Sequence, residues 1–319
     1  MVDGEYRVER YGPERAADVV VIHRAVYGPG LTVEALRSKF DTGFSGHDVI
    51  GHVAYAPSGE PAAYYGVFPV KVRGGETTVV AAQSGDTMTH PDHQGRGLFT
   101  MLGRATYEAA AAEGIAFVFG FPNENSYPGF VRKLGWTHTR TMRARWWPVP
   151  TVPVAFLAKG DTGLGRRLHA AQVRLVRALR LAAPVEQIGS SVTDAGEAGV
   201  DRDDGYLAYK RTDLLGFTQS GVVAYLKLGP GPVLKLGDLR VVRPGASVLP
   251  ALIRITAIAV VCGIPRVSYH VSPGSASDRA LSKWALTKVG LPYGHISFAP
   301  RPAPDPADVN FTYLDYDTY

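Results

Sequence analysis

The amino-acid sequence predicts an α/β fold of the α+β kind, divided into two units. Two kinds of segment are mixed along the chain: some alternate apolar and polar residues, as strands do, and others have the apolar spacing of helices. A strand–helix–strand order at residues 78–121 recurs at residues 238–271. The chain has 319 residues, of which 45% are hydrophobic and 20% charged, so it can hold one large or two medium domains. We expect a first domain at residues 1–150, a connecting basic helix and loop at 151–200, and a second domain at 201–319.

The first domain begins with elements that hydrophobic periodicity separates from one another. Strands are expected at residues 6–11, 49–56, 62–72 and 78–89, and helices at residues 14–27 and 32–40. Thr32 can cap the second helix, and Glu34 places a carboxylate in its first turn, where the helix dipole favours one. Pro57-Ser58-Gly59-Glu60 indicates a hairpin between the second and third strands.

A glycine-containing turn follows the last of these strands. The strand breaks at Pro91, the sequence Gln94-Gly95-Arg96-Gly97-Leu98-Phe99 comes next, and a helical pattern runs on to Glu113. Two glycines between a strand and a helix allow a tight turn whose N–H groups point one way, with the positive end of the helix dipole behind them. Such a concavity binds phosphate or pyrophosphate. It is neither a Walker loop, since no Gly-Lys-Ser/Thr follows, nor the dinucleotide motif GxGxxG.

The segments around this turn occur in a characteristic order. A strand at residues 83–89, the turn, a helix at 98–113, a strand at 115–121, an Asn-containing loop at 123–126 and the sequence Leu134-Gly135-Trp136 follow one another. This order resembles the GNAT superfamily of acyl-CoA-dependent N-acyltransferases over roughly residues 5–145. The resemblance implies GNAT-like units with mixed, mostly antiparallel sheets, and acetyl-CoA or another acyl-CoA as co-substrate. One departure is Phe99, which replaces the final Gly or Ala of the family's turn and is expected to contact a packed helix or the pantetheine arm.

The resemblance also implies which residues hold the co-substrate. The backbone of Thr87, Met88 and Thr89 would pair with the pantetheine arm and polarise the thioester oxygen. The expected pyrophosphate site consists of Gln94, Gly95, Arg96, Gly97, Leu98 and Phe99, with Arg96 either adding charge or simply being solvated. Asn123 or Asn125 would hydrogen-bond the pantetheine amides.

Two positions at which family members carry catalytic residues differ in this sequence. Gln83 stands where histone-type members carry a glutamate, so Asp86 is the nearest carboxylate that can act as general base. Alternatively, Asp86 braces the strand through an Asx-type hydrogen bond. Val131 stands where many members carry a tyrosine, and Tyr127, one helical turn earlier, is the candidate for protonating the thiolate, unless its ring packs over the CoA arm. Because Pro128 follows it, Tyr127 is expected to begin its helix.

Residues 164–182 are expected to form a basic amphipathic helix. Leu164, Leu168, Ala171, Leu175 and Leu179 fall on one side, and Arg166, Arg167, Arg174, Arg177 and Arg180 gather elsewhere. One interpretation is a membrane-surface or phosphate-binding role. The preferred interpretation is a connecting helix with a solvated arginine face.

The second half repeats the first in a weaker form. Residues 238–244 echo residues 86–91 ahead of a helix, and Cys262-Gly263-Ile264 echoes Glu113-Gly114-Ile115 ahead of a strand. The sequence Pro244-Gly245-Ala246-Ser247 supplies no Q-x-x-G-x-x turn. We therefore interpret this half as a degenerate GNAT-like unit that no longer binds CoA, with an unrelated α/β domain as the alternative.

The second half is also expected to form the acceptor side of the site. Tyr206, Tyr209, Tyr269, His270, Tyr293 and His295 could stack on a base or sugar, although most of them, taken singly, are expected in the core or at its rim. Asp315, Asp317 and the terminal carboxylate of Tyr319 could hold a substrate ammonium or act as base. The preferred interpretation for these acidic groups is an exposed tail.

Two segments resemble a narrower group of bacterial GNAT enzymes with an extended C-terminal half. They are FPNENSYPGF at residues 121–130 and FTYLDYD at residues 311–317. Some of these enzymes acylate nucleotide-linked amino sugars, and others act on natural-product amines. The expected function is N-acyl transfer to a small-molecule amine, with a nucleotide-linked amino sugar as the acceptor. An aminoglycoside or other natural-product amine, and a CoA-binding protein without catalysis, are the alternatives.

Composition and charge exclude other classes. The net charge of +5 does not form the dense basic stripe of a nucleic-acid binder, so no nucleic-acid partner is expected. The only cysteine, Cys262, rules out an internal disulfide and is interpreted as a small core residue. No N-terminal signal is evident, and the longest apolar run, at residues 251–264, contains Arg254 and is too short to span a bilayer. We expect a cytoplasmic protein with no membrane partner and no metal site.

Overall fold

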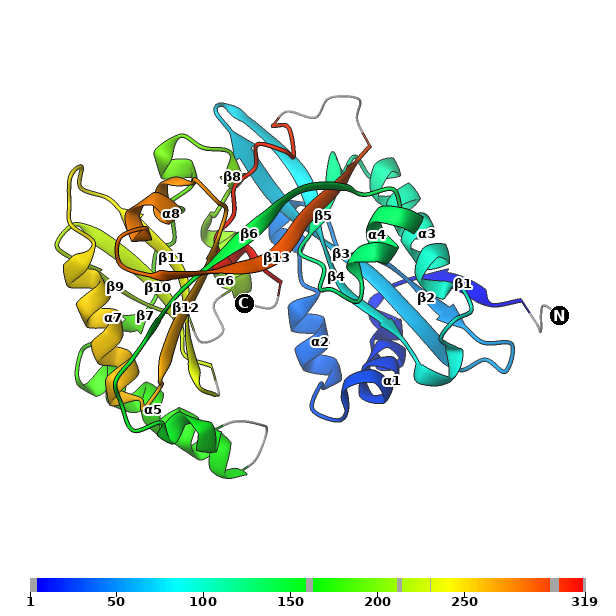
Figure 1. Ribbon diagram of the computed structural model, residues 1–319. Coiled ribbons are helices and arrows are strands. Elements are labelled where there is room, and N and C mark those ends of the chain that lie inside the picture. Colours follow the sequence, from blue (N-terminus) through cyan, green and yellow to red (C-terminus); the bar gives the residue numbers. More distant parts are fainter. Residues whose placement is uncertain (1–4, 159–162, 211–213, 230, 299–303, 318–319) are drawn as a thin grey trace. The chain divides into compact units, whose positions relative to one another are not determined.

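The computed structural model describes residues 5–158, 163–210, 214–229, 231–298 and 304–317. Contacts divide the chain into two compact units, whose elements are labelled in Figure 1. Unit 1 comprises residues 1–72, 77–140 and 292–307, and unit 2 comprises residues 73–76, 141–291 and 308–319. Each unit is thus assembled from segments that are far apart in the sequence.

This division differs from the expected boundaries at residues 150 and 200. Strands β6 (Thr137–Pro148) and β13 (Leu286–Ser297) each begin in one unit and end in the other. Hydrophobic spacing predicts that a segment is a strand, but it carries no information on which sheet the strand joins. A division of the sequence into consecutive domains therefore cannot show that residues 292–307 belong to unit 1.

Unit 1 contains a mixed sheet with the order β1-β2-β3-β4-β5-β13. Its further strands are β1 (Arg7–Arg10), β2 (Ile50–Tyr55), β3 (Pro61–Gly74), β4 (Thr77–Thr89) and β5 (Phe117–Gly120). Its helices are α1 (Ala16–Tyr27), α2 (Val33–Lys39), α3 (Leu98–Ala112) and α4 (Tyr127–Lys133), with short 3₁₀ helices η1 (Pro13–Arg15), η2 (Gly43–Ser45) and η3 (Pro91–His93). β4 and β5 run parallel, whereas the β1–β2, β2–β3 and β5–β13 pairs are antiparallel.

Helices cover both faces of this sheet (Figure 1). On one face, Leu102 and Ala110 of α3 belong to a buried cluster with Ala82 of β4. On the other face, Val19 of α1 belongs to a cluster with Val53 of β2. The β4–α3–β5 crossover is therefore held from both sides by buried apolar side chains, whose removal from water stabilises the unit.

Local signals in the sequence determine where several elements begin. Thr32 caps α2 as predicted, because its Oγ1 accepts a hydrogen bond of 3.1 Å from the backbone N–H of Ala35. α4 begins at Tyr127, directly ahead of Pro128, which confirms the prediction that this tyrosine starts its helix. The hairpin between β2 and β3 also forms at the predicted residues 57–60.

In unit 2 the strands follow the order β6-β12-β11-β10-β9-β7. Its further strands are β7 (Ala183–Pro184), β8 (Gly199–Val200), β9 (Leu214–Gln219), β10 (Val222–Lys227), β11 (Val233–Val241) and β12 (Arg266–Val271). Its helices are α5 (Gly163–Ala178), α6 (Asp204–Lys210), α7 (Leu249–Val261) and α8 (Ala276–Leu281), with 3₁₀ helices η4 (Val154–Ala158), η5 (Thr193–Ala195) and η6 (Tyr313–Asp315).

The strand–helix–strand order of unit 1 recurs in unit 2. β11 and β12 run parallel and are joined by α7, just as β4 and β5 are joined by α3. Ile255 and Ile258 of α7 are buried against Leu234 of β11 and Val267 of β12. The predicted α/β fold class with mixed, mostly antiparallel sheets is confirmed.

Cys262, which follows α7, is a core residue as predicted. Its side chain is 1% exposed, and burial raises the pKa of the thiol to about 12. Its carbonyl oxygen accepts a 2.7 Å hydrogen bond from Gln172 Nε2 of α5. A thiol that stays protonated at neutral pH is a poor nucleophile.

Helix α5 does not pack through its leucines. The buried residues of α5 are Gly165, Gln172 and Val176, which occupy a stripe adjacent to the leucine stripe. Leu164 and Leu175 are 66% and 43% exposed. None of the described helices is both long and apolar enough to cross a membrane.

Candidate active site

Strand β4 continues beyond its pairing with β5. The two strands pair at Ala82↔Val118 and Gln83↔Phe119, and β5 ends at Gly120, but β4 runs on to Thr89. Within this extension the side chain of Met88 is buried at 2% exposure, so what this residue can offer to a ligand is its backbone. The extension therefore presents a strand edge that β5 does not cover.

The turn at residues 94–99 borders a cavity beside this extension. Gly95 and Gly97 adopt φ angles of 75° and 80°, in the left-handed region that favours glycine, and Gly97 caps α3. A Cβ atom at either glycine would meet no protein atom within 4 Å, so the space in front of both is open. The cavity of about 260 Å³ is lined by Thr89, His93, Gln94, Gly95, Arg96, Gly97, Leu98, Phe99, Thr100 and Lys133. Backbone amides and the helix dipole at this position favour an anion.

Lys133 adds a positive charge that the sequence analysis did not assign. It is the last residue of α4 and lines the same cavity as Arg96. Two cations beside an open helix N-terminus suit a doubly charged pyrophosphate. In the sequence, the basic pair Arg132-Lys133 just before Leu134-Gly135 could have indicated a cation near the turn. Only the folded structure shows that Lys133, and not Arg132, lines the cavity.

Phe99 packs between α3 and α4. Its ring meets that of Phe130 edge to face, with centroids 5.1 Å apart, and lies 6.2 Å from the ring of Tyr65. Of its two expected contacts, the one with a packed helix is therefore present, and the side chain also lines the cavity.

A buried hydrogen-bond network fixes the base of the β4 extension. The Tyr65 hydroxyl lies 2.8 Å from both Ser84 Oγ and the Tyr107 hydroxyl, and Trp136 Nε1 donates to Tyr107 at 2.8 Å. Burial raises the pKa of Tyr65 and of Tyr107, so both hydroxyls stay protonated. Ser84 immediately follows the last residue of β4 that pairs with β5. The network thus ties the start of the extension to α3 and to the Leu134-Gly135-Trp136 segment.

Asp86 makes an ion pair, and its side chain forms no Asx-type hydrogen bond with any described residue. Its Oδ1 lies 2.6 Å from Lys39 Nζ at the end of α2, and the two side chains are 19% and 31% exposed. Asp86 has a φ angle of 45°, a left-handed conformation that few non-glycine residues adopt and that Asp tolerates better than most. Burial and, next, the charge of Asp86 raise the pKa of Tyr64. The carboxylate is therefore held in place at the edge of the site.

Two buried polar atoms near the sheet have no partner among the described residues. They are Nε2 of Gln83, a side chain with 4% exposure, and the hydroxyl of Tyr64. Buried donors without partners are uncommon in folded proteins and often accompany a bound water or ligand. Gln83 can donate a hydrogen bond to such a group, but it cannot accept a proton as a glutamate would.

The loop that precedes α4 is braced by its own side chains. Asn123 Oδ1 accepts hydrogen bonds of 3.0 Å from the backbone N–H groups of Asn125 and Ser126. Asn123 therefore uses its oxygen locally, while Asn125 is exposed. The ring of Tyr127 meets that of His138 edge to face, with centroids 5.6 Å apart. Neither Asp86 nor Tyr127 is among the described residues that line the cavity.

Several residues proposed for acceptor binding are core residues. Tyr206, Tyr269 and Tyr293 are at most 1% exposed, so they cannot stack on a substrate from their present positions. This outcome agrees with the expectation that most of the second-half aromatics are core or rim residues. His270 is stacked on Tyr313, with ring centroids 4.3 Å apart and an interplanar angle of 8°.

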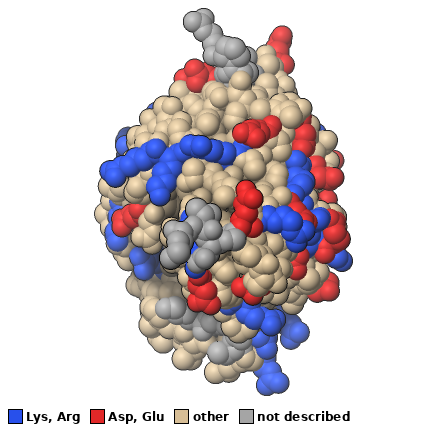
Figure 2. Space-filling model, turned by 90° about the vertical axis from the view of Figure 1, so that its right-hand side faces the viewer, with Lys and Arg blue, Asp and Glu red and all other residues tan. Residues whose placement is uncertain are grey.

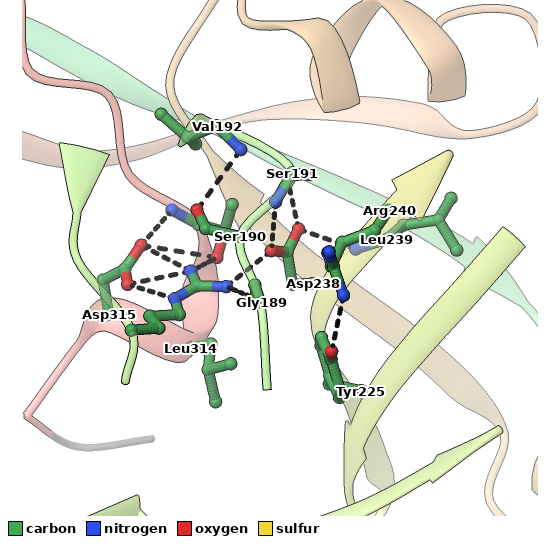
Figure 3. Close-up of polar contacts among 12 residues, drawn as sticks. Gly189, Ser190, Ser191, Val192, Tyr225, Asp238, Leu239, Arg240, Leu314 and Asp315 are labelled. Carbon is green, nitrogen blue, oxygen red and sulfur yellow. Dashed lines mark hydrogen bonds and ion pairs between the residues drawn. The ribbon is translucent and has the colours of Figure 1, made fainter. Parts of the chain in front are cut away.

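Asp315 does not lie in an exposed tail, and that prediction was wrong. Its side chain is buried, and Arg202 Nη2 donates to its two oxygens at 2.8 and 2.9 Å. Arg202 Nη1 also lies 2.6 Å from Asp238 Oδ2, so the guanidinium joins two buried carboxylates (Figure 3). Although burial opposes its charge, the carboxylates of Asp315 and Asp238 raise the pKa of Arg202. Asp317 is half-buried, and Tyr319 lies outside the described residues.

On the face drawn in Figure 2, Lys and Arg side chains are interspersed with Asp and Glu rather than gathered in one continuous stripe. No group of three or more His, Cys, Asp or Glu among the described residues could hold a metal ion.

Comparisons with known proteins agree with this geometry. Residues 7–139 match the family model of the acetyltransferase (GNAT) domain. A comparison with curated proteins gives no match.

Solved structures share the fold over almost the whole chain. A probable N-acyltransferase of Enterococcus faecalis V583 has a TM-score of 0.61 at 13% identity, covering 92% of this chain and 73% of the other. A GCN5-related N-acetyltransferase of Kribbella flavida has a TM-score of 0.58 at 15% identity, with 92% and 71% covered. A proposed acetyltransferase of Pyrococcus horikoshii has a TM-score of 0.58 at 16% identity, with 99% and 96% covered. Residues 7–139, which include the turn and the cavity at the start of α3, are thus similar to the GNAT acetyltransferase domain, and this match supports an acyl-CoA-dependent N-acyltransferase that uses acetyl-CoA or another acyl-CoA as co-substrate.

Proposed function

We propose that the protein moves an acetyl or other short acyl group from acyl-CoA to the amine of a nucleotide-linked amino sugar. The observation that carries the transfer is the open cavity formed by Thr89 and the turn at residues 94–99, beside a strand edge that β5 leaves uncovered. The acceptor rests on the resemblance of residues 121–130 and 311–317 to enzymes of that kind.

Within this proposal the pyrophosphate occupies the cavity. The amides of Gly95 to Phe99 donate to its oxygens, and Arg96 and Lys133 balance its charge. The pantetheine arm pairs with the backbone of Thr87, Met88 and Thr89, whose N–H groups orient the thioester and polarise its carbonyl oxygen. Asn125, whose side chain is exposed, hydrogen-bonds a pantetheine amide, and Asn123 holds the loop in shape.

Asp86 and Tyr127 are the proposed acid–base groups. The acceptor amine must lose a proton to attack the thioester carbon, and Asp86 is the carboxylate on the β4 extension that can take it. An incoming ammonium would replace Lys39 as the partner of Asp86. Tyr127, at the start of α4, would protonate the departing CoA thiolate. Tyr127→Phe should lower turnover by less than Asp86→Asn, because a thiolate can leave without being protonated.

The alternative acceptor, an aminoglycoside or other natural-product amine, has lost part of its support. That reading used Asp315 and Asp317 as the walls of a cleft for a cationic substrate. Asp315 is buried in its ion pair with Arg202, so its carboxylate is already neutralised.

Two measurements test the proposal in sequence. Acetyl-CoA at saturating concentration should raise the melting temperature, since a ligand that binds only the folded state stabilises it. Release of free CoA should then be followed with three sets of amines: nucleotide-linked amino sugars, aminoglycosides and simple polyamines. Turnover with the first set supports the proposal. A thermal shift without turnover on any amine would indicate a CoA-binding protein, and turnover confined to aminoglycosides would replace the acceptor.

A cytoplasmic setting is part of the same proposal. The chain has one cysteine and therefore needs no oxidising compartment to form a disulfide. Fractionation of cells that produce the protein, with activity followed in each fraction, tests this directly.

A further inference from the structure

The surface formed by η4 and α5 exposes large apolar side chains. Phe156 and Leu157 of η4 are 54% and 63% exposed, and Leu164, Leu175 and Leu179 on or just after α5 are 66%, 43% and 52% exposed. The two segments pack against each other within unit 2, where Figure 1 shows α5. Grouped apolar exposure of this kind marks an interaction surface, whereas single exposed apolar residues are ordinary.

The leucines are exposed because α5 is anchored through a different stripe. Gly165, Gln172 and Val176 are buried, and Gln172 is bonded to the carbonyl of Cys262. Successive side chains of an α-helix point in directions about 100° apart. The stripe with Leu164 and Leu175 therefore cannot face the core when the stripe with Gly165, Gln172 and Val176 does. The apolar stripe is thus left over after the helix has been fixed to its own unit.

Arginines without acidic partners accompany this stripe. Arg167 and Arg174 each precede a leucine of the stripe, at Leu168 and Leu175, and α5 itself contains no Asp or Glu. The side chains of Arg167, Arg174, Arg177 and Arg180 are exposed and make no ion pair or hydrogen bond with any described residue. The positive charge of the surface is therefore not compensated by the part of the chain that the structure describes.

A cavity at the end of α5 collects three arginines. Its volume is about 410 Å³, and its lining contains no acidic residue: Arg177, Arg180, Ala182, Ala183, Pro184, Gly216, Phe217, Thr218 and Arg254. The guanidinium of Arg254 lies 4.6 Å from the ring centroid of Phe217 and donates to the carbonyl oxygens of Arg180 and Leu181 at 2.7 and 2.9 Å. Arg254 is thereby held in place, while Arg177 and Arg180 are free to turn toward a ligand.

We propose that the α5–η4 surface docks on an anionic lipid bilayer, with the exposed leucines and Phe156 at the acyl boundary and a lipid phosphate in the arginine cavity. A helix with leucines on one stripe and arginines beside it lies in the plane of such an interface, where apolar burial and charge attraction act together. Arginine also binds phosphate with two parallel hydrogen bonds. A second copy of the chain fits less well, because self-association would bring the uncompensated arginines of both copies together. The inference is independent of the acyl-transfer reaction.

Vesicle sedimentation tests the proposal. The full-length protein should sediment with vesicles that contain phosphatidylglycerol, remain in solution with pure phosphatidylcholine vesicles, and be released as salt is raised. Leu164→Glu/Leu175→Glu should abolish sedimentation. Arg177→Ala/Arg180→Ala should weaken it about 25-fold, since each basic residue near an anionic surface contributes about fivefold. Arg24→Ala/Arg104→Ala, which removes the same charge from exposed positions on α1 and α3, is the matched control and should bind as wild type.

Each result decides for or against the proposal. All variants should keep the wild-type thermal shift with acetyl-CoA in solution, which shows that they are folded. The proposal is overturned if wild type does not prefer anionic vesicles, or if the control loses as much binding as the cavity variant, which would indicate net charge alone. It is also overturned if light scattering shows a dimer that the Leu164→Glu/Leu175→Glu variant dissociates without any vesicle binding, which would assign the surface to a second copy.

Discussion

The crossover β4–α3–β5 in unit 1 and the crossover β11–α7–β12 in unit 2 are built alike but end differently. In both, two parallel strands pair over a few residues: Ala82 and Gln83 in β4, and Val233 to Leu236 in β11. In both, the first strand continues after the pairing stops, as far as Thr89 and Val241. The same topology therefore produces two places where a strand edge is left without its parallel neighbour.

In unit 2 the chain fills this place with its own C-terminal segment. Phe311 is fully buried, and its backbone exchanges hydrogen bonds of 2.9 Å with Ser272 just after β12. Thr312 forms a bridge with Val271, and η6 packs against both β11 and β12. Arg202 then joins Asp315 of this segment to Asp238 of β11.

The comparison shows what separates a binding site from a structural core in this fold. Asp86 and Asp238 begin the two similar sequence segments at residues 86–91 and 238–244, yet Asp86 is part-exposed and pairs with one lysine, whereas Asp238 is fully buried. The F-T-x-x-D-x-D run at residues 311–317 is thus explained by packing. Its first residue, Phe311, is buried beside β12, and its fifth residue, Asp315, makes an ion pair with Arg202. Substitutions in each of the two units can test this difference.

The largest effect is expected from Arg202→Ala. It leaves Asp238 and Asp315 buried without a countercharge, so the free energy of unfolding should fall by about 3–5 kcal/mol. Urea denaturation measures this value. Arg279→Ala, which removes an exposed arginine that pairs with Glu197 at 3.5 Å, is the matched control and should change stability by less than about 1 kcal/mol. Equal losses in both variants would show that the buried network does not hold the segment in place.

Next in size is the effect of Gly97→Val on CoA binding. Valine is strained at a φ angle of 80°, and its branches would occupy the open space at the start of α3, so affinity for acetyl-CoA should fall at least about 100-fold, equivalent to about 2.7 kcal/mol. Gly245→Val is the counterpart in unit 2, where φ is 74° and the space is equally open. Titration calorimetry should find that Gly245→Val binds acetyl-CoA as wild type does. A similar loss in both variants would mean that general strain, rather than the turn, governs binding.

A smaller effect is expected from Asp86→Asn, which tests the proposed base. Turnover at neutral pH should fall by about 10- to 1,000-fold, and the loss should shrink at high pH, where more of the acceptor amine is already neutral. Lys39→Met breaks the same ion pair but keeps the carboxylate, so it should retain most of the activity. If Lys39→Met loses as much turnover as Asp86→Asn at every pH, Asp86 acts by holding β4 against α2 and not as a base.

The smallest effect concerns the dependence of stability on pH, and it compares one partly buried histidine from each unit. Burial lowers the pKa of His52 and of His270 to about 4 from an ordinary value near 6.5. The unfolded chain then binds more protons than the folded one between these values, so stability is complete above about pH 6.5 and is lost as the pH falls toward 4. After allowance for partial exposure, each histidine should account for about 1 kcal/mol.

Thermal melts from pH 8 to 4 check this expectation. His270→Phe, which keeps the stacking on Tyr313, and His52→Gln, which can keep the contact with Thr106, should each flatten the decline. At pH 8 neither native histidine carries a charge in either state, so the melts there report only the packing change of each variant. Unaltered slopes in both variants would assign the acid sensitivity to other groups.

The sequence by itself determined the features that depend on neighbouring residues. Helix and strand positions follow from periodicity, the Thr32 cap from one side chain, the start of α4 from Pro128, and the turn at residues 94–99 from its two glycines. The repeat of the crossover in unit 2 was also readable, because each copy carries its own local pattern. These features need only the backbone preferences of a few consecutive residues.

Only the tertiary structure decided which distant residues pair beside the two uncovered strand edges. Lys39 meets Asp86 across 47 positions, and Arg202 meets Asp315 across 113. No local preference selects such partners, because a charged side chain in the unfolded chain is hydrated whether or not a partner is near. It requires a particular partner only when folding removes the water around it. The leucine stripe of α5 follows the same logic: its periodicity predicts an apolar side, but only packing determined that the adjacent stripe would face the core.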